Sequence, residues 1–326
     1  MKFLWSILTL SSFFPSALLG AEKAPTQQKL VALTAIVPHP SLEQAKAGVL
    51  AQLAADGFVV GKNLKIIEEN AQGSIATANL IAKKFVGMNP SPDLIIAIST
   101  PSTQAVKNAA KHTNIPIVFV SVSDPVAAGL VENLTAVQTQ ITGAIDSPMI
   151  HEIQTLIKEL VPKAKVLGAV YNPGEANSTK ALADLKASLD PSLKLLESAV
   201  NSSNLVADGL RSIVKKVDAL YIPLDNTVVS ALPKFIQIAN AHKIPTFSSD
   251  PQHVTQGVFA SYGYSQFAVG QTAGAKAAKI LNGAKVSSLP ISTPFALEAS
   301  INKRTAKLLN IAVPSQFNKI AVKMID

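Results

Sequence analysis

The sequence contains no cysteine among its 326 residues. This absence excludes disulfides, thiolate metal sites, iron–sulfur clusters, cysteine nucleophiles and any lipid attached through a cysteine. Arginine is also scarce, since Arg211 and Arg304 are the only two, and the lysines are spread along the chain. A nucleic-acid groove needs clustered cations and favours arginine, so no nucleic-acid partner is expected despite a formal net charge of +8.

The common signatures of enzymes and metal sites are missing as well. There is no G-x-x-x-x-G-K-[ST] phosphate loop, no G-x-G-x-x-G after the first predicted strand and no G-x-S-x-G elbow. The five histidines lack metal-ligand spacing, and Ser212 with Lys215 matches S-x-x-K only within an amphipathic helical pattern. The sequence therefore predicts no catalytic residue, no metal and no cofactor.

The first 21 residues have the layout of a secretory signal peptide. Lys2 precedes the apolar run 3–19, and the small residues Gly20 and Ala21 follow it. An uncleaved membrane anchor is the alternative, although Pro15 and the small residues after it favour cleavage. Because no cysteine can carry a lipid, the sequence predicts an exported protein without an anchor, in the periplasm.

From Lys29 onward, short β-branched segments alternate with helical patterns. Strands are predicted at residues 30–37, 63–69, 93–99, 115–122, 166–171, 194–200, 219–224, 244–248 and 258–261, and helices at 41–55, 75–86, 102–111, 149–160, 176–189, 205–216, 228–241 and 268–281. This alternation predicts an α/β fold with parallel sheets. The strands are too many for one comfortable open sheet, so we expect two similar lobes that meet near residues 140–146.

A polar residue followed by proline recurs where a predicted strand ends. The pairs are His39-Pro40, Thr100-Pro101, Asp124-Pro125, Asn172-Pro173 and Asp250-Pro251. Taken singly, each pair is more simply a helix cap than a ligand contact. In parallel α/β sheets, however, ligands bind beyond the carboxyl ends of the strands. Two facing lobes would direct into one cleft the side chains of Thr100, Ser102, Asp124, Asn172, Glu175, Asp225, Asn226 and Asp250, with His39 as an isolated further candidate.

The chemistry of this set suits a zwitterion. Residues 100–103 offer hydroxyls, free backbone N–H groups and the positive end of a helix dipole, which together can receive a carboxylate. Asp124, Glu175, Asp225 and Asp250 are acids in the predicted cleft, which suits an ammonium group, and Asp124, Asp225 or Asp250 is expected to hold it. Tyr171, Tyr262 and Tyr264 are candidates for stacking, while packing is the simpler role of a tyrosine at a strand end. The residues therefore predict a ligand such as an amino acid.

Several stretches, in this order along the chain, carry a family resemblance. They are Asn70-Ala71-Gln72-Gly73, residues 76–79 and 82–86, 97–102, 115–119 leading to Ser123-Asp124-Pro125, Tyr171-Asn172 with 175–178, 225–230 and Ser248-Ser249-Asp250. The chain resembles the solute-binding proteins of ABC transporters, in the group that includes tryptophan and other aromatic amino acid binders. The resemblance covers residues 29–313, nearly all of the chain after the predicted signal peptide.

The resemblance implies a type I periplasmic-binding fold: two Rossmann-like lobes with parallel sheets, joined by a three-strand hinge that closes on a ligand. Residues 29–143 with 257–288 would form the N-terminal lobe, and residues 144–256 with 289–326 the C-terminal lobe. The pocket would include the loops at Thr100, Pro101 and Ser102, at Ser123 and Asp124, at Asn172, Glu175 and Asn177, at Asp225 and Asn226, and at Ser249 and Asp250.

The implied function is an amino acid receptor of an ABC importer, with an aromatic ligand favoured, an inner-membrane ABC permease as partner and a monomeric state. Two alternatives remain open from the sequence: a ligand-sensing protein for a membrane receptor, and an exported enzyme on the same scaffold. A branched-chain amino acid, a peptide fragment or a nucleoside-like solute also fits the polar set.

Overall fold

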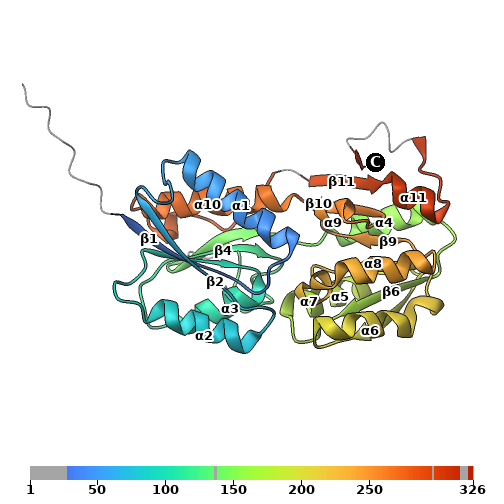
Figure 1. Cartoon of the computed structure of the whole chain (residues 1–326), viewed down its shortest axis with the longest axis horizontal. Helices are drawn as coiled ribbons and strands as arrows, with labels where there is room; N and C mark the ends of the chain where they lie inside the picture. The colour runs from blue at the N-terminus through green and yellow to red at the C-terminus, as the bar shows by residue number, and fades with distance from the viewer. Residues whose placement is uncertain (1–27, 136–137, 296, 316–321, 326) are drawn as a thin grey trace, which may run out of the picture.

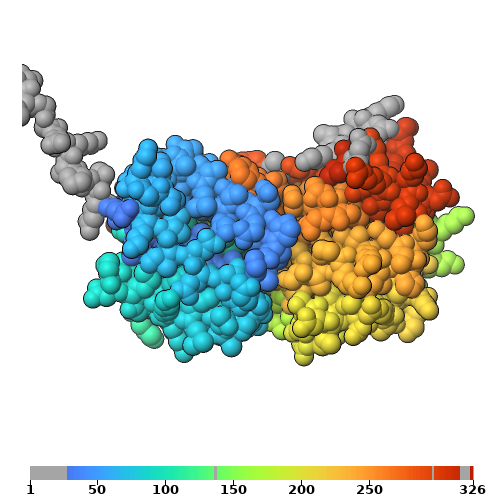
Figure 2. Space-filling model, in the orientation of Figure 1, coloured from blue at the N-terminus to red at the C-terminus, as the bar shows by residue number. Residues whose placement is uncertain are grey.

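Two lobes joined by three crossings make up the structure, a computed structural model that describes residues 28–135, 138–295, 297–315 and 322–325 (Figure 1). The predicted signal peptide at residues 1–21 lies outside this part of the chain. Within the described residues, no helix is both long and apolar enough to cross a membrane. The two lobes meet along one side of the N-terminal lobe, where α1 lies against α9 (Figure 2).

The N-terminal lobe is built on a five-stranded parallel sheet with the order β2-β1-β3-β4-β5. Its strands are β1 (Lys29–Ala35), β2 (Leu64–Asn70), β3 (Leu94–Ile98), β4 (Ile117–Val122) and β5 (Ile141–Ile145), and its helices are α1 (Pro40–Ala55), α2 (Ile75–Val86), α3 (Thr100–Ala109) and α10 (Gln266–Leu281). Every residue of β3, β4 and β5 is buried. These strands are almost wholly apolar because helices cover both faces of the sheet.

The C-terminal lobe has a seven-stranded sheet with the order β12-β11-β10-β9-β8-β6-β7. Its strands are β6 (Val166–Tyr171), β7 (Lys194–Ala199), β8 (Ala219–Ile222), β9 (Thr246–Ser248), β10 (Ala260–Tyr264), β11 (Leu297–Asn302) and β12 (Val322–Ile325). Its helices are α4 (Ile150–Leu160), α5 (Ala176–Ser188), α6 (Val206–Ile213), α7 (Asn226–Ser230), α8 (Leu232–Ala241), α9 (Gln252–Thr255) and α11 (Lys303–Leu309). All neighbouring strands are parallel except β10 and β11, and separate apolar cores cover the two faces.

The predicted α/β fold with two parallel-sheet lobes is confirmed, and the nine predicted strands correspond to β1–β4 and β6–β10. The sequence analysis missed β5, β11 and β12. The residues of β11, LEASIN, mix polar and small side chains and lack a β-branched run. The predicted lobe boundary at residue 257 is also displaced, because β10 pairs with β9 and β11 in the C-terminal sheet. The chain crosses only after β10, at Ser265.

Two of the five polar–proline pairs begin long helices. His39 is the N-cap of α1, and α3 begins at Thr100 with Pro101 in its first turn. Asp124-Pro125 and Asn172-Pro173 lie in turns instead, and α5 begins at Ala176 with Glu175 as its N-cap. Asn172 therefore stabilises a turn ahead of α5, in which its carbonyl accepts the Glu175 N–H and its side chain accepts the Gly174 N–H.

Helices α1 and α10 pack backbone against backbone. A Cβ atom at Gly270 would lie 2.0 Å from the Ala45 carbonyl oxygen, and one at Gly48 would lie 2.1 Å from the Phe267 carbonyl oxygen. Only glycine permits so close an approach at these two positions. Since α10 directly follows a crossing between the lobes, α1 is held firmly to the hinge.

The three crossings are tied to one another. The first follows β5 at Asp146, the second is at Ser265, and the third runs from residue 289 toward β11. The Ile145 N–H donates to the Ser292 carbonyl (3.0 Å), which joins the first and third crossings. Gln266 Nε2 donates to Asp146 Oδ2 (2.6 Å), which joins the second to the first. The structure thus contains the three-segment hinge that the resemblance implied.

Candidate functional site

A cavity of about 30 Å³ lies between the two lobes. Its walls come from the N-terminal lobe (His39, Ser41, Leu42, Ser99, Thr100, Ser121 and Ser123), from the hinge (Asp146 and Gln266) and from the C-terminal lobe (Asn177, Leu224, Asp225, Asn226, Val229, Asp250 and His253). One water needs roughly 10–15 Å³ of such space, so the cavity has room for two or three waters. The lobes are therefore closed on each other, and a larger ligand requires them to separate.

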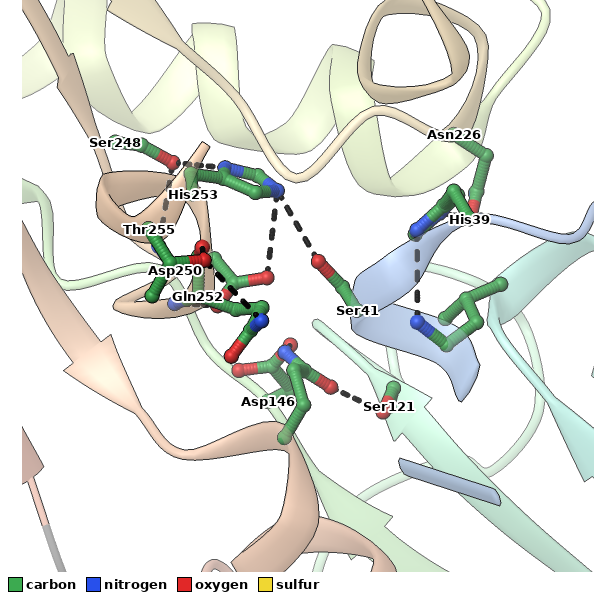
Figure 3. A network of polar contacts seen from close by, with 12 residues as sticks. His39, Ser41, Ser121, Asp146, Asn226, Ser248, Asp250, Gln252, His253 and Thr255 are labelled. Carbon is green, nitrogen blue, oxygen red and sulfur yellow. Dashed lines mark hydrogen bonds and ion pairs between the residues drawn. The ribbon is translucent and has the colours of Figure 1, made fainter. Parts of the chain in front are cut away.

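Seven of the predicted site residues line this cavity: His39, Thr100, Ser123, Asn177, Asp225, Asn226 and Asp250. Six predicted residues are not among its lining residues: Pro101, Ser102, Asp124, Asn172, Glu175 and Ser249. The predicted tyrosines pack at the edges of the apolar cores instead of entering the cavity. Figure 3 shows part of the polar network around the cavity.

The start of α3 forms one wall. The hydroxyls of Ser99 and Thr100, which line the cavity, are buried and have no hydrogen-bond partner, and the same is true of Ser102 behind them. Ser99 has φ of 80° and Ser121 has φ of 56°, in the left-handed region that non-glycine residues rarely adopt. Such strain costs about 1–3 kcal/mol per residue and gathers at functional sites. The free hydroxyls and the helix N-terminus make this wall a receptor for an anionic group.

The hinge forms a second wall. Ser121 Oγ donates to Gln266 Oε1 (2.7 Å), and Gln266 Nε2 donates in turn to Asp146 Oδ2 (2.6 Å). Asp146 Oδ1 is buried and has no partner. Burial raises the pKa of Asp146 to about 7, and Asp250 contributes in the same direction. A cation that reached this free oxygen would restore the charged carboxylate, since opposite charge lowers the pKa of an acid.

Two histidines join the lobes across the cavity (Figure 3). His39 Nδ1 accepts from the Leu42 N–H (3.5 Å), so Nε2 carries the proton and faces Asn226 Oδ1 at 3.5 Å. His253 of the C-terminal lobe lies 3.2 Å from Ser41 Oγ of the N-terminal lobe. Burial lowers the pKa of both histidines, that of His39 to about 4. Both rings are therefore neutral in the closed form at neutral pH.

His253 is also bound within its own lobe. Its Nδ1 lies 2.7 Å from Ser248 Oγ, and its Nε2 lies 3.3 Å from Asp250 Oδ2. The other oxygen of Asp250 accepts the Gln252 N–H (2.8 Å). Among the described residues, no three His, Asp or Glu side chains are grouped closely enough to hold a metal ion.

Asp225 was predicted to contact the ligand, but its carboxylate is occupied by the protein. Oδ1 accepts the Val228 N–H (2.9 Å) at the start of α7, and Oδ2 accepts from the Asn172 N–H and from Ser178 Oγ (2.6 Å each). Burial and the neighbouring Glu175 raise the pKa of Asp225 to about 8. Its role is to cap α7 and to fix the turn at Asn172.

Glu175 and Asn172 are likewise structural. Glu175 accepts from the backbone N–H and the side chain of Asn226 (3.1 and 2.6 Å) and from the corresponding groups of Thr227 (2.9 and 2.8 Å). Asn172 accepts the Gly174 N–H and donates to Thr227 Oγ1. These residues orient Asn226 toward His39, so they affect the cavity through Asn226 without lining it.

The remaining predicted residues also lie outside the cavity. Asp124 accepts the N–H groups of Val126 and Ala127, and its other oxygen lies 3.6 Å from Lys180 Nζ of the opposite lobe. It is an ion-pair partner at the rim rather than a wall of the cavity. Ser249 Oγ is 3.3 Å from the Tyr221 hydroxyl. Pro101 is buried in the first turn of α3.

The sequence analysis missed Asp146, Gln266 and His253, which lie at the centre of the site. Asp146 had a usable signal, because it directly follows the buried segment Ile141–Ile145, as the other cleft residues follow their strands. Gln266 had a similar signal, because it begins α10 two residues after β10, as Thr100 begins α3 two residues after β3. His253 gave no such signal, since it lies inside the short helix α9, and only the tertiary fold brings it to the cleft.

Residues 30–325 match the family described as ABC transporter substrate binding protein. The chain belongs to this family. A relative described as a tyrosine-binding protein, from Clostridioides difficile (strain R20291), is 38% identical over 286 residues, which cover 87% of this chain and 82% of the relative. The type I periplasmic-binding fold and the group with aromatic amino acid binders, both implied by the sequence, are thereby confirmed.

Two similar solved structures indicate how the lobes are arranged. A domain from Streptococcus pneumoniae in complex with L-Trp has a TM-score of 0.86 at 29% identity, covering 92% of this chain and all of that one. A ligand-free, open substrate-binding protein from Clostridium difficile has a TM-score of 0.66 at 35% identity, covering 91% and 99%. The better superposition belongs to the less similar sequence, so the lobes here are arranged more as in the L-Trp complex.

Proposed function

We propose that this protein is the periplasmic receptor of an ABC importer and that it binds an amino acid, with an aromatic side chain favoured, between its lobes. The predicted signal peptide and the absence of cysteine support an unanchored, exported form. The relatives named above are binding proteins, which supports a cycle of binding and release without chemistry. A membrane permease would be the partner that receives the ligand.

The observation that carries the proposal is a pair of complementary groups in one cavity. The start of α3 offers the hydroxyls of Ser99 and Thr100 without partners, and the hinge offers Asp146 Oδ1 without a partner. Buried polar atoms are normally hydrogen-bonded, so hydroxyl donors and a carboxylate acceptor left unpaired in one cavity indicate a ligand site. The first wall suits a carboxylate and the second suits an ammonium group. An α-amino acid carries both.

The side chain of the ligand has an apolar contact available. Leu42 from the N-terminal lobe and Leu224 and Val229 from the C-terminal lobe line the same cavity. Three aliphatic side chains support a hydrophobic group, and His39 and Asn226 beside them support a polar tip. The relatives described as tyrosine-binding and as bound to L-Trp favour an aromatic amino acid.

Closure follows from the same contacts. The ligand enters the open cleft, its carboxylate binds at α3, and its ammonium group binds Asp146 at the hinge. Since Asp146 and Gln266 lie on two different crossings, a ligand held there contacts the elements that rotate. The lobes then close around the ligand, with His39 and His253 facing it from the cavity wall, and water is excluded.

Isothermal titration with L-tyrosine, L-tryptophan, L-phenylalanine and L-leucine would test this proposal. Tyramine, which lacks the carboxylate, and 3-(4-hydroxyphenyl)propionate, which lacks the ammonium group, are the matched controls. We expect one or more aromatic amino acids to bind and both truncated analogues to bind at least about tenfold more weakly, because each loses a charge-assisted contact. Equal affinity for tyramine and L-tyrosine would contradict the carboxylate assignment, and failure of every amino acid would overturn the ligand class.

A further inference from the structure

One face of the C-terminal lobe concentrates positive charge that the cavity does not use. The last turn of α6 and the 3-10 turn after it (Val214–Lys216) expose Arg211, Lys215 and Lys216, and the neighbouring helix α8 and the turn after it expose Lys234 and Lys243. Helices α6 and α8 are in contact. These cations therefore lie on one continuous surface instead of being dispersed over the molecule.

Helix α11 borders this surface but packs on the other face of the sheet, because its Ala306 and Leu309 belong to the same core as α4 and α5. It contacts α8, and Lys243 Nζ donates to the Leu308 carbonyl (2.7 Å), which joins the ends of the two helices. Its exposed residues are Lys303, Arg304, Lys307 and the apolar Leu308. We call the exposed side of α6, the turn 214–216 and α8, with the turn that follows α8, the basic face. Residues 205–217 and 232–243 contain five Lys or Arg and a single acid, Asp208, so positive charge dominates the face.

A groove of about 440 Å³ runs between α6 and α8 at the centre of the basic face. Arg211, Lys215, Lys234 and His242 surround it, and its floor includes the apolar Val214 and other aliphatic side chains. Lysine and arginine rest their alkyl chains on such a floor and direct their charges outward. A groove of this kind suits a phosphate group that is attached to a glyceryl or acyl portion.

We propose that the basic face is a docking surface for a membrane rich in anionic phospholipids. Four of its five Lys or Arg residues are lysines, which act as point charges toward phosphate and need no planar partner. Polybasic surfaces are drawn to anionic lipid headgroups through the summed attraction of their charges. Because the chain has no cysteine, no thioether lipid is available to keep it at the membrane, and the basic face supplies an alternative.

The geometry leaves the ligand site free. None of the described residues that line the cavity belongs to α6, α8 or α11. Docking by the basic face would therefore hold the protein beside the membrane while the lobes open and close. The inference rests on the proposed function only in placing the protein near a membrane, and it can be tested without any ligand.

The test is sedimentation of the chain from Glu22 onward with vesicles of phosphatidylcholine, either alone or with about one-third phosphatidylglycerol. Salt screens such contacts over about 10 Å at 0.1 M, so binding to the anionic vesicles should fall steeply with ionic strength. The variant Lys215→Glu with Lys234→Glu should bind at least about tenfold more weakly. Lys62→Glu with Lys65→Glu on the N-terminal lobe changes the net charge equally at exposed positions and is the matched control.

Retention of vesicle binding by the control pair and its loss in the basic-face pair would support the proposal. Equal binding to both kinds of vesicle, or equal loss in the two variants, would overturn it, because net charge alone would then explain the result. Binding to DNA or heparin without binding to vesicles would overturn it as well and would identify a soluble polyanion as the partner. L-tyrosine titration of the same variants keeps this outcome separate from failure of the proposed function.

Discussion

His39 Nε2 lies 3.5 Å from Asn226 Oδ1, and this contact joins the N-cap of α1 in one lobe to the first residue of α7 in the other. The amide of Asn226 is oriented by Glu175, which accepts from its Nδ2. His39 Nδ1 accepts the Leu42 N–H, so a second ring proton has no acceptor there. The closed form thus requires His39 to be neutral, whereas the ring can accept a proton when the cleft is open.

The first prediction concerns pH. The pKa of His39 is lowered from 6.5 to about 4 in the closed form, chiefly by burial and then by His253. In the open form, exposed to water, it should return toward 6.5. Above pH 6.5 the His39 ring is neutral in both forms and does not oppose closure. As pH falls from 6.5 toward 4, the ring gains a proton only in the open form, and closure becomes less favourable. The contribution of His39 should therefore make closure about tenfold less favourable at pH 5.5 than at pH 7.5.

The measurement uses the absence of cysteine. Fluorescent labels on Leu80→Cys and Leu205→Cys, two exposed positions on opposite lobes, would report the distance between the lobes with and without L-tyrosine. His39→Asn keeps an N-capping side chain that does not titrate, and should remove the contribution of His39 to the pH response. His112→Asn, an exposed histidine, is the control and should retain it. Burial also lowers the pKa of His253 and raises the pKa values of Asp146 and Asp225, and these two acids favour the closed form as pH falls. The contribution of His39 is therefore the difference between the native chain and His39→Asn, and the absence of a difference would contradict the prediction.

The second prediction concerns Asp146. Asp146→Asn keeps an oxygen that can accept from Gln266 but removes the charge, so the affinity for an amino acid should fall at least about tenfold. Because burial raises the pKa of Asp146 to about 7, the variant should be at least as stable as the native chain above that pH. Calorimetry gives the affinity and thermal melting the stability. Asp124→Asn makes the same chemical change at the rim and should alter affinity by less than about threefold.

The third prediction tests whether Asp225 stabilises the fold instead of contacting the ligand. Asp225→Ala leaves the N–H groups of Asn172 and Val228 and the hydroxyl of Ser178 without their acceptor. The free energy of unfolding should drop by about 2–4 kcal/mol, measured by denaturant titration. Asp208→Ala, which removes an exposed carboxylate paired with Arg211, is the matched control and should change it by less than about 0.5 kcal/mol. Unaltered stability together with lost binding would restore Asp225 as a direct ligand contact.

The fourth prediction concerns the contact of α1 with α10. Gly270→Ala places a methyl group 2.0 Å from the Ala45 carbonyl oxygen, so the helices must move apart. Overpacking of this kind costs about 1–3 kcal/mol, which lowers the melting temperature. Thr272→Ala on the same helix removes only a hydroxyl bonded to the Ala268 carbonyl and should have a smaller effect. A Gly270→Ala variant that melts like the native chain would show that α1 and α10 can separate without cost.

Much of the fold could be predicted because each buried parallel strand is a short, mostly apolar run of consecutive residues, such as Leu94–Ile98 and Ile117–Val122. The site was harder to predict. The strand-end rule reached His39, Thr100, Asn226 and Asp250, which line the cavity. The same rule gave Glu175 and Asp225 as ligand contacts, because a sequence cannot tell an acid facing a ligand from one saturated by backbone N–H groups. Gln266 follows β10 as the other cleft residues follow their strands, but β10 is longer than predicted and ends further along the chain. His253 comes to the cavity through the short helix α9, and no local pattern marks it.

The ties among the three crossings restrict how the molecule can move. Ile145 is bonded to Ser292, Gln266 to Asp146, and Lys276 Nζ donates to Ser292 Oγ (2.5 Å), so no crossing can bend alone. The lobes should then rotate about a single axis, and one angle should describe the whole opening. A substitution at any crossing would shift that angle's preferred value, and ligand affinity would follow it even where the substituted side chain never touches the ligand.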